Sequence, residues 1–264
     1  MFTSAKRIVI KIGSSLIIGE DGHVRKAWLD TLASDISELK KAGKEIIIVT
    51  SGAVGLGRFV LNYGSRSLEL GEKQAAAACG QLPLIVQWEN ALRNDERWLH
   101  AAQILLTADD IHNNIRATNA INTLETLLKN SSIVPVINEN DTVATEELRV
   151  GDNDSLAAHV AQMAKAGLLI LFSDIDGLYS ENPHNNPNAK FQEKISEITP
   201  EIEAMAGGAR NTIGTGGMTT KIIAAKIATE AGCNMIIAKG TENHPLKALM
   251  EGGKSTLFVA KKNK

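Results

Sequence analysis

The chain has 264 residues, of which 44% are hydrophobic, 22% are charged and only 4% are aromatic. Its 28 basic and 30 acidic residues give a formal net charge of -2, which argues against a basic surface for nucleic acid or an anionic membrane. Scarce aromatic side chains also argue against a platform for stacking bases. A chain of this length can bury a large core, as one domain or two, without a disulfide or metal.

Nothing in the sequence indicates a membrane, a secretory route or redox chemistry. No segment approaches the roughly 18 consecutive apolar residues of a membrane-spanning helix, and residues 1–7 contain no apolar signal-peptide region. Cys79 and Cys233 lie far apart without a metal-ligand spacing, so we interpret them as ordinary buried thiols in a reducing compartment. We therefore expect a cytoplasmic globular protein.

Strand-like and helix-like segments alternate along the chain. The first five strand-like runs are apolar almost throughout, which is typical of strands covered on both faces. The alternation predicts an α/β fold with a mainly parallel sheet and helices on both sides. In chain order the prediction is strand 7–12, helix 26–41, strand 45–49, helices 72–94 and 115–129, strand 133–137, helix 155–166, strand 168–172, helix 219–231, and strands 234–238 and 256–260.

Three glycines and one polar segment are predicted to lie between these helices and strands. Gly43, Gly167 and Gly232 each follow a predicted helix and precede a strand, so we expect them to end the helices as left-handed cap residues. Residues 181–190 are polar and interrupted by proline, which predicts a loop. This loop does not separate segments of different composition, so residues 1–264 are predicted to form one domain.

Polar or glycine-rich segments occur where a ligand site is expected. In open α/β sheets, ligands bind beyond the carboxyl ends of the strands. Glycine-rich turns that lead into helices present backbone N–H groups to phosphate oxygens, and Lys11 and Lys221 add point charges for a phosphoryl group. The candidate segments are 11–15, 50–57, 138–141, 151–154, 173–177 and 214–221.

Each of these features also has a purely structural interpretation. A single glycine-rich turn is usually only a turn, Lys221 on a helix is by default a solvated lysine, and Asp152 is by default a helix N-cap. The six histidines, His159 among them, fit no metal-ligand spacing. The functional interpretation depends on several polar loops meeting at the same end of the sheet.

The standard nucleotide-binding fingerprints are not met. Gly253, Lys254 and Ser255 nearly complete a P-loop, but Ala248 stands where the motif needs its first glycine. A dinucleotide-binding signature that starts at Gly55 breaks at Val60, and the protein-kinase motifs are missing. A P-loop enzyme and a Rossmann oxidoreductase are both disfavoured.

Read together, the motifs resemble the amino acid kinase superfamily and, within it, the glutamate 5-kinase family. The resemblance extends over about residues 7–259, and its most specific pieces are residues 137–141 together with 151–154. It implies a three-layer αβα sandwich around a mainly parallel sheet, with ATP over one half of the carboxyl edge and an amino acid over the other. The motifs that carry it are 9–15, 49–54, 103–107, 135–141, 150–156, 176–179 and 214–221.

The resemblance also implies roles for individual residues. Lys11 and Lys221 would neutralise charge on the transferring phosphoryl group, and Asp154 would hold both ammonium groups in place. The ATP-binding residues would be Lys11, Ser173, Asp174, Thr215, Gly216, Gly217, Met218, Thr219, Thr220 and Lys221. The substrate-binding residues would be Ser51, Asp141 and Asn153, with Gly52 and Asn138 as weaker candidates.

The implied reaction is transfer of a phosphoryl group from ATP to the side-chain carboxylate of L-glutamate, the first step of proline biosynthesis. Such a carboxylate is ionised at pH 7 and needs no general base, so charge neutralisation and positioning suffice. Mg²⁺ would be carried by the phosphates without named protein ligands. Two alternatives are an acetylglutamate kinase and a non-catalytic sensor. Acetylglutamate is less favoured, because its acetylated amine carries no charge for a carboxylate such as Asp141 to bind.

Three further expectations come from the resemblance alone. Many bacterial members carry a C-terminal domain of the PUA type, whereas this sequence stops after its last predicted strand, so we expect a form without that domain. A homo-oligomer, either dimer or tetramer, is expected. Feedback inhibition by proline is a trait of the family that no residue here demonstrates.

Overall fold

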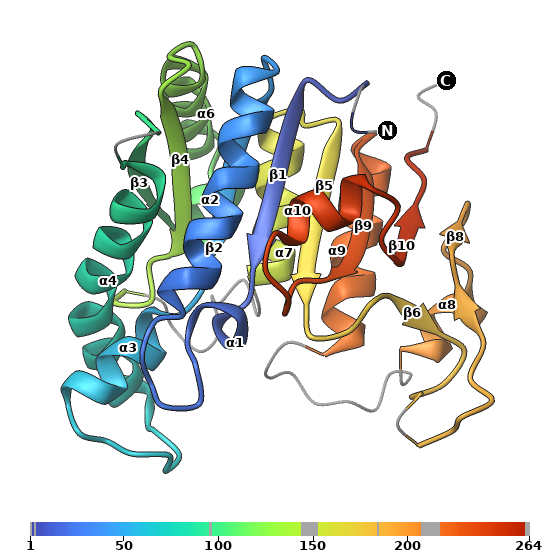
Figure 1. The fold of residues 1–264 in the computed structure, drawn as a ribbon, viewed down its shortest axis with the longest axis horizontal. Coiled ribbons are helices and arrows are strands. Elements are labelled where there is room, and N and C mark those ends of the chain that lie inside the picture. Colours follow the sequence, from blue (N-terminus) through green and yellow to red (C-terminus); the bar gives the residue numbers. More distant parts are fainter. Residues whose placement is uncertain are drawn as a thin grey trace.

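An eight-stranded sheet runs through the middle of the molecule (Figure 1). The computed structural model describes residues 2, 4–94, 97–143, 153–183, 185–206 and 217–261. In sheet order the strands are β3 (His100–Leu106), β4 (Ile133–Glu139), β2 (Glu45–Thr50), β1 (Arg7–Ile12), β5 (Leu168–Ser173), β9 (Asn234–Lys239), β10 (Ser255–Phe258) and β8 (Lys194–Ile195).

Neighbouring strands of this sheet are parallel, except that β10 runs antiparallel to β9. A separate two-stranded antiparallel sheet joins β6 (Leu178–Tyr179) to β7 (Phe191–Gln192). The carboxyl ends of β1, β2, β4, β5 and β9 therefore lie along one edge. The expected mainly parallel sheet is confirmed.

Side chains alternate between two hydrophobic cores, one on each face of the sheet. In β1, Ile8, Ile10 and Ile12 pack into one core, whereas Val9 packs into the other. This alternation follows from the two-residue period of a strand. It explains why the central strands are apolar at nearly every position, since neither face meets solvent.

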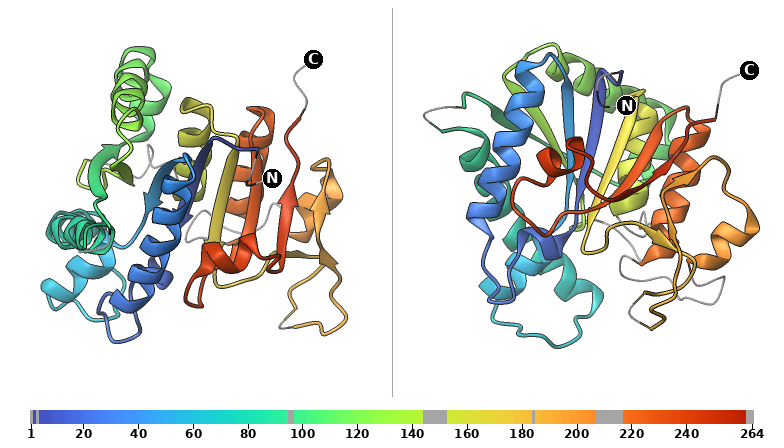
Figure 2. Two further views of the ribbon diagram at one scale, coloured as in Figure 1. Left: turned by 45° about the horizontal axis from the view of Figure 1, so that its top comes forward. Right: turned by 45° about the vertical axis from the view of Figure 1, so that its right-hand side comes forward.

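Helices cover both faces (Figure 2), as a three-layer αβα sandwich requires. One core takes side chains from α2, α3, α4 and α10, and the other takes them from α6, α7 and α9. The helices are α1 (Ser14–Ile17), α2 (Lys26–Lys41), α3 (Ala53–Val60), α4 (Leu70–Leu92), α5 (Ala108–His112), α6 (Asn114–Leu128), α7 (Asn153–Met163), α8 (Pro200–Met205), α9 (Met218–Glu230) and α10 (Pro245–Met250).

The six predicted strands and five predicted long helices are all present, with ends shifted by at most three residues. Strand β3 is absent from the prediction because its first residues, His100 to Gln103, lack β-branched side chains; pairing with β4 decides their conformation. The prediction of a glycine-rich loop over residues 50–57 was wrong for its second half. Gly55 and Gly57 lie inside helix α3, so this segment is not an open phosphate-binding loop.

The predicted cap glycines are right in two cases and wrong in one. Gly43 and Gly232 have positive φ angles of 79°, and each follows a helix end as a left-handed cap. After α7 the left-handed residue is Lys165, with φ 49°, because the helix ends at Met163, earlier than expected. Gly167 instead lies beside Ala5, where an added Cβ would be 3.3 Å from the Ala5 Cβ.

Residues 181–183 and 185–190 contain no helix or strand, as the predicted loop requires. Among the described helices, none combines the length and apolar character needed to cross a membrane.

Candidate active site

Two lysines and one aspartate form a buried cluster at the carboxyl edge of the sheet. The Lys11 Nζ lies 2.6 Å from the Asp154 Oδ1, and the Lys221 Nζ lies 3.0 Å from the Asp154 Oδ2. Lys11, Asp154 and Lys221 are only 6%, 0% and 4% exposed. Buried ammonium groups are rare unless they are paired, and here two of them share one carboxylate. Within these three side chains, two formal positive charges face one negative charge.

Local structure explains how three distant residues meet. Lys11 follows Ile10 in β1, so strand alternation directs it to the face that α7 and α9 cover. Asp154 lies in the first turn of α7, and Lys221 lies near the start of α9. Alanines three and four positions further along both helices are fully buried in the same core: Ala157, Ala158, Ala224 and Ala225. Small side chains let the helices approach closely, and residues at this spacing share a face.

The carboxylate of Asp154 stays ionised in this setting. Burial by itself raises the pKa of Asp154, but the adjacent Lys11 and Lys221 ammonium groups outweigh it and lower the pKa below its usual value. The Thr220 hydroxyl also donates a hydrogen bond of 3.0 Å to the Asp154 Oδ2. Both carboxylate oxygens are thus occupied by protein groups, so Asp154 is suited to positioning lysines rather than to accepting a proton.

A chain of amide side chains forms the neighbouring part of the edge. The two N–H groups of the Asn153 Nδ2 are within hydrogen-bond distance of three acceptors: the Thr50 carbonyl at 2.8 Å, the Ser51 Oγ at 2.6 Å and the Asn138 Oδ1 at 3.1 Å. The Asn138 Nδ2 in turn donates to the Gln81 Oε1 at 2.9 Å. Asn138 is buried. The structure therefore brings together Ser51, Asn138 and Asn153, three of the five predicted substrate-binding residues.

The other two predicted substrate-binding residues flank this chain. Gly52 is the N-cap of α3 and has a φ angle of 114°, a left-handed conformation that favours glycine. Asp141 lies in the turn that follows β4. Both come from segments that end at the same edge as Asn138 and Ser51, so the predicted substrate residues all lie at the carboxyl ends of β2 and β4 or at the start of α7.

A cavity of about 990 Å³ opens beside the lysine cluster, at the ends of β5 and β9. Five predicted ATP-binding residues line it: Ser173, Asp174, Gly217, Met218 and Lys221. Thr220 and Thr219 do not line it: the Thr220 hydroxyl donates to Asp154, and the Thr219 hydroxyl donates to the Ala206 carbonyl. Thr215 and Gly216, like Gly151 and Asp152, lie outside the described residues.

Sequence reasoning missed several residues of these two regions. Gln81 on α4 contacts Asn138, but a lone glutamine on a long helix gives no signal in the sequence. Lys239, at the end of β9, lines the cavity, and its place directly after an apolar run could have indicated it. Asp176 and Tyr179 also line the cavity; they lie in a motif that carries the family resemblance, but the motif alone implies no role for them.

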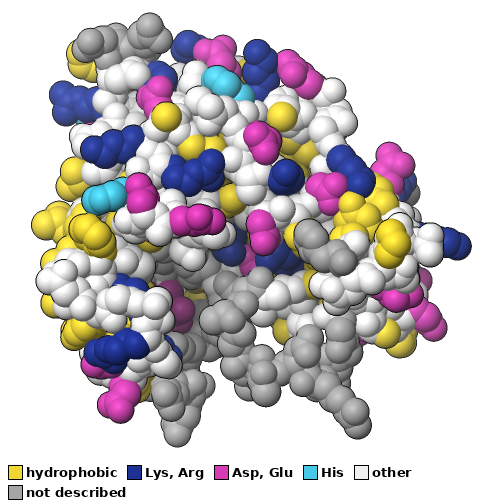
Figure 3. Space-filling model, turned by 60° about the horizontal axis from the view of Figure 1, so that its bottom comes forward, with side chains coloured by type: hydrophobic (Ala, Val, Ile, Leu, Met, Phe, Trp, Pro, Cys, Tyr) yellow, Lys and Arg dark blue, Asp and Glu magenta, His cyan; other side chains and the backbone are white. Residues whose placement is uncertain are grey.

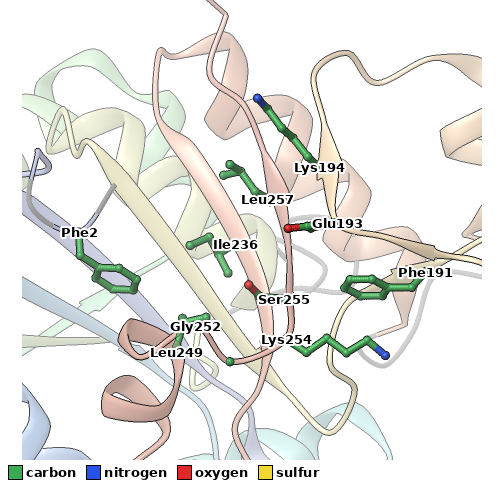
Figure 4. A pocket seen from close by; sticks show the side chains of 11 residues that line it. Phe2, Phe191, Glu193, Lys194, Ile236, Leu249, Gly252, Lys254, Ser255 and Leu257 are labelled. Carbon is green, nitrogen blue, oxygen red and sulfur yellow. The ribbon is translucent and has the colours of Figure 1, made fainter.

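A second cavity, of about 520 Å³, lies beside β9, β10 and the end of α10 (Figure 4). Its lining includes Phe2, Ile236, Leu249 and Leu257, which belong to the opposite core. On the face that Figure 3 draws, the described basic and acidic side chains are intermingled. Among the described residues, no three His, Cys, Asp or Glu side chains are grouped to hold a metal ion.

Comparison with known proteins identifies the class to which this fold and site belong. Residues 6–239 match the amino acid kinase family. The chain therefore belongs to the amino acid kinase family.

Within that family the chain is similar to glutamate 5-kinases. It is 54% identical over 257 residues to the enzyme of Paramagnetospirillum magneticum. The aligned region covers 97% of this chain and 68% of that protein. It is 55% identical over 254 residues to the enzyme of Sinorhizobium fredii. Here the aligned region covers 96% of this chain and 64% of that protein. The chain thus spans about two thirds of the length of these curated relatives.

Solved structures of more distant kinases share the fold. Carbamate kinase from Giardia lamblia, bound to AMP-PNP, superposes with a TM-score of 0.69 at 17% identity and covers 99% of this chain and 100% of its own. UMP kinase from Ureaplasma parvum gives a TM-score of 0.62 at 18% identity, over 96% of this chain and 98% of its own. The expected amino acid kinase fold is confirmed.

Proposed function

We propose that this chain catalyses transfer of the γ-phosphoryl group of ATP to the side-chain carboxylate of L-glutamate. The products are ADP and L-glutamyl 5-phosphate, and the reaction is the first step of proline biosynthesis. The similarity to glutamate 5-kinases supports the choice of acceptor. The observation that carries the proposal is the buried pair of lysines on one aspartate, between the amide chain and the large cavity.

The proposed reaction sets an electrostatic problem that this cluster can solve. A glutamate carboxylate in water has a pKa of about 4.3 and is ionised at pH 7, so it needs no base, but it must approach an anionic triphosphate. Lys11 and Lys221 would neutralise charge on the phosphoryl group as it transfers. Asp154 holds the two ammonium groups, which would otherwise repel each other, in place for that role.

Acceptor and donor would then lie on opposite sides of the cluster. Ser51, Asn138 and Asn153 would bind glutamate, with Gly52 beside them and Asp141 facing its ammonium group. The large cavity would take ATP, bound by Ser173, Asp174 and the segment from Thr215 to Lys221. Positioning two reactants in this way converts a bimolecular step into a nearly unimolecular one.

Mg²⁺ is the cofactor that we propose beside ATP. Asp154, the buried carboxylate that pairs with the lysines, is already bonded to Lys11, Lys221 and Thr220. It is therefore unsuited to act as a ligand of Mg²⁺. Mg²⁺ prefers oxygen ligands and retains several waters, so it would enter on the phosphates. When bound, it would add further neutralisation of the phosphate charge.

An assay of acyl phosphate formation tests the proposed function. The chain is incubated with Mg-ATP and hydroxylamine, which converts an acyl phosphate to a hydroxamate, and ADP is measured in parallel. L-Glutamate, N-acetylglutamate and L-aspartate are offered separately. We expect hydroxamate and ADP in equal amounts with glutamate, and at most traces with the other two. Hydroxamate mainly from acetylglutamate would identify the rival kinase, and none from any acceptor would favour a sensor.

Asp141 provides a test of the acceptor site. Replacing Asp141 with alanine removes the carboxylate proposed to face the substrate ammonium group, so we expect the KM for glutamate to rise at least about tenfold. The KM for ATP should change less than about twofold. Steady-state kinetics with each substrate varied in turn measures both values. Equal increases in the two KM values would contradict the assignment.

We also propose that the chain assembles into a homo-oligomer, either a dimer or a tetramer. Exposed apolar side chains on α4, Leu82 at 70% and Val86 at 43%, support association. Light scattering coupled to size-exclusion chromatography measures the mass in solution. A mass that equals one chain at micromolar concentration would refute this part of the proposal.

A further inference from the structure

Lys254 lies between the two cavities and is not used by the proposed mechanism. It belongs to the near-miss P-loop segment Gly253, Lys254 and Ser255 and directly precedes β10. All three residues line the smaller cavity. Figure 4 shows that the Lys254 side chain extends away from Leu249 and Ile236 and that its nitrogen ends beside Phe191. The ammonium group therefore points toward the segment that contains β6 and β7.

The ammonium group of Lys254 makes polar and aromatic contacts with that segment. Its Nζ donates to the Tyr179 hydroxyl at 2.6 Å and lies 3.1 Å from the Asp176 Oδ2. It also lies 4.5 Å from the ring centroid of Phe191, within the range of a cation–π interaction. The Tyr179 hydroxyl donates in turn to the Asp176 Oδ1 at 2.8 Å, which closes a ring of three polar groups.

Two of these partners belong to the wall of the large cavity. Asp176 and Tyr179 both line it, together with Lys221, Gly217 and Ser173. Lys254 itself is not among the lining residues. Lys254 therefore contacts this wall through Asp176 and Tyr179.

The backbone of the same wall is held by a different residue. Thr256 is fully buried, and its hydroxyl accepts from the Leu178 N–H at 2.7 Å and donates to the Gln192 carbonyl at 2.6 Å. Gly177 passes so close to it that an added Cβ would be 2.4 Å from the Thr256 Oγ1. Thr256 thus fixes the backbone, whereas Lys254, whose side chain is 50% exposed, contacts the side chains of Asp176 and Tyr179.

We propose that Lys254 is a positioning residue for the nucleotide, because it holds the side chains of Asp176 and Tyr179 in the orientation that shapes the cavity wall. The inference rests on the proposed function only in taking the large cavity as the nucleotide site. A half-exposed lysine contributes little to folding. Its loss should therefore affect nucleotide affinity more than the stability of the whole chain.

Binding of AMP-PNP with Mg²⁺, measured by titration calorimetry on the full chain without glutamate, tests this inference. Lys254→Met keeps the length of the side chain but removes its charge, and we expect the dissociation constant to rise about fivefold. Lys254→Arg, which keeps the charge, should stay within about twofold of the wild type. Lys247→Met is the matched control, because Lys247 is an exposed lysine of α10 that lines neither cavity.

A double mutant shows whether Lys254 acts through Tyr179. Tyr179→Phe removes the hydroxyl by which Lys254 holds this side chain, so the double variant should bind AMP-PNP more tightly than the product of the two single effects predicts. In steady-state kinetics, the KM for ATP should rise with the dissociation constant, while the KM for glutamate and kcat stay within about twofold.

Two results would overturn the inference. One is unchanged nucleotide affinity in Lys254→Met. The other is a double variant in which the two single effects multiply, because Lys254 would then act independently of Tyr179. Loss of AMP-PNP affinity in Lys254→Met, in a chain that forms no glutamyl hydroxamate, would instead support the positioning role and refute only the proposed acceptor.

Discussion

Asp154 stands at the point where the two halves of the site meet, and its charge decides whether both lysines can be buried. An ammonium group that loses its partner in a buried site either deprotonates or draws in water. Lys11 comes from the central strand β1 and Lys221 from α9. One carboxylate thus ties a strand to a helix across the core and fixes two positive charges a few ångströms apart.

Replacement of either lysine tests this arrangement at the residue scale. Lys11→Ala or Lys221→Ala should lower kcat about 10²–10³-fold, because each removes one preorganised charge from the transition state. Lys226→Ala is the control, since Lys226 lies on the same helix α9 but pairs with Glu203 at the surface. Single-turnover hydroxamate formation measures the chemical step. Near-normal turnover in either lysine variant would refute the assignment.

The two cysteines should differ in reactivity because only one is fully buried. Burial raises the pKa of the Cys233 thiol to about 12, whereas Cys79 on α4 is partly exposed. A thiol must ionise to react, so DTNB at pH 8 should titrate one thiol in the native chain and both in urea. Rapid reaction of both native thiols would contradict this burial. In Cys233→Ala, the thiol that reacts only in urea should be missing, and the thiol that reacts in the native chain should remain.

The same raised pKa predicts how stability depends on pH. In the unfolded chain, a cysteine ionises near its ordinary pKa of about 8.5, but folded Cys233 keeps its proton, so the folded state binds the extra proton. Stability relative to Cys233→Ala should therefore fall above about pH 9, by about 1.4 kcal/mol per pH unit. Urea unfolding of both proteins at pH 8 and pH 10 measures the difference. A constant difference between the two pH values would contradict the prediction.

At the scale of elements, helices α3 and α4 are held together by a close glycine contact. An added Cβ at Gly80 of α4 would be 1.8 Å from the carbonyl oxygen of Ala53 in α3. Gly57 of α3 approaches α4 just as closely, since its Cβ would be 1.6 Å from the Ala76 carbonyl. These contacts involve backbone atoms that cannot rotate away. They place the start of α3, and with it Ser51 and Gly52, beside the amide chain.

Gly80→Ala should therefore disturb both stability and the acceptor site. We expect a loss of about 1–3 kcal/mol in the free energy of unfolding, as for an overpacked core, and a higher KM for glutamate. Gly71→Ala is the matched control, because Gly71 lies in the same helix with nothing within 4 Å of an added Cβ. That substitution should instead stabilise α4 by about 0.5–1 kcal/mol. Urea unfolding measures both variants, and equal effects would refute the packing argument.

At the scale of the whole molecule, both cores extend along the sheet from the acceptor half to the nucleotide half. The core on the α2 side contains residues from β4, β2, β1, β5 and β9, and the other core likewise joins α6 to α9. No boundary between the halves is visible in the described hydrophobic cores. This continuity supports one cooperative unit over the described chain.

Calorimetry tests this cooperativity. We expect a single unfolding transition, and saturating Mg-AMP-PNP at 100 times its dissociation constant should stabilise the whole transition by about 2.7 kcal/mol. The acceptor half should unfold together with the nucleotide half, because they share the cores. Two transitions, of which only one shifts with nucleotide, would show two independent units.

Much of this architecture could be predicted because the signals are local. A nearly continuous apolar run, such as residues 8–12, predicts a strand in a sheet that is covered on both faces. The alternation of such runs with helical segments leads to a parallel sheet, whose carboxyl ends must meet at one edge. That reasoning was enough to place Lys11 and Asn138 at the same edge, whereas the position of Asp154 beside Lys11 and Lys221 was implied by the family resemblance.

Tertiary structure decided what local signals could not. Strand β3 forms through pairing with β4, and Gly55 and Gly57 belong to a helix because α4 packs closely against it. The contact between Gln81 and Asn138 joins residues 57 positions apart, and that of Lys254 with Tyr179 spans 75. The sequence by itself determined the strands, the helices and the charged groups at the carboxyl edge, since periodicity and residue type are local properties. Only the fold decided which side chains hold those groups in place, because their partners depend on long-range packing.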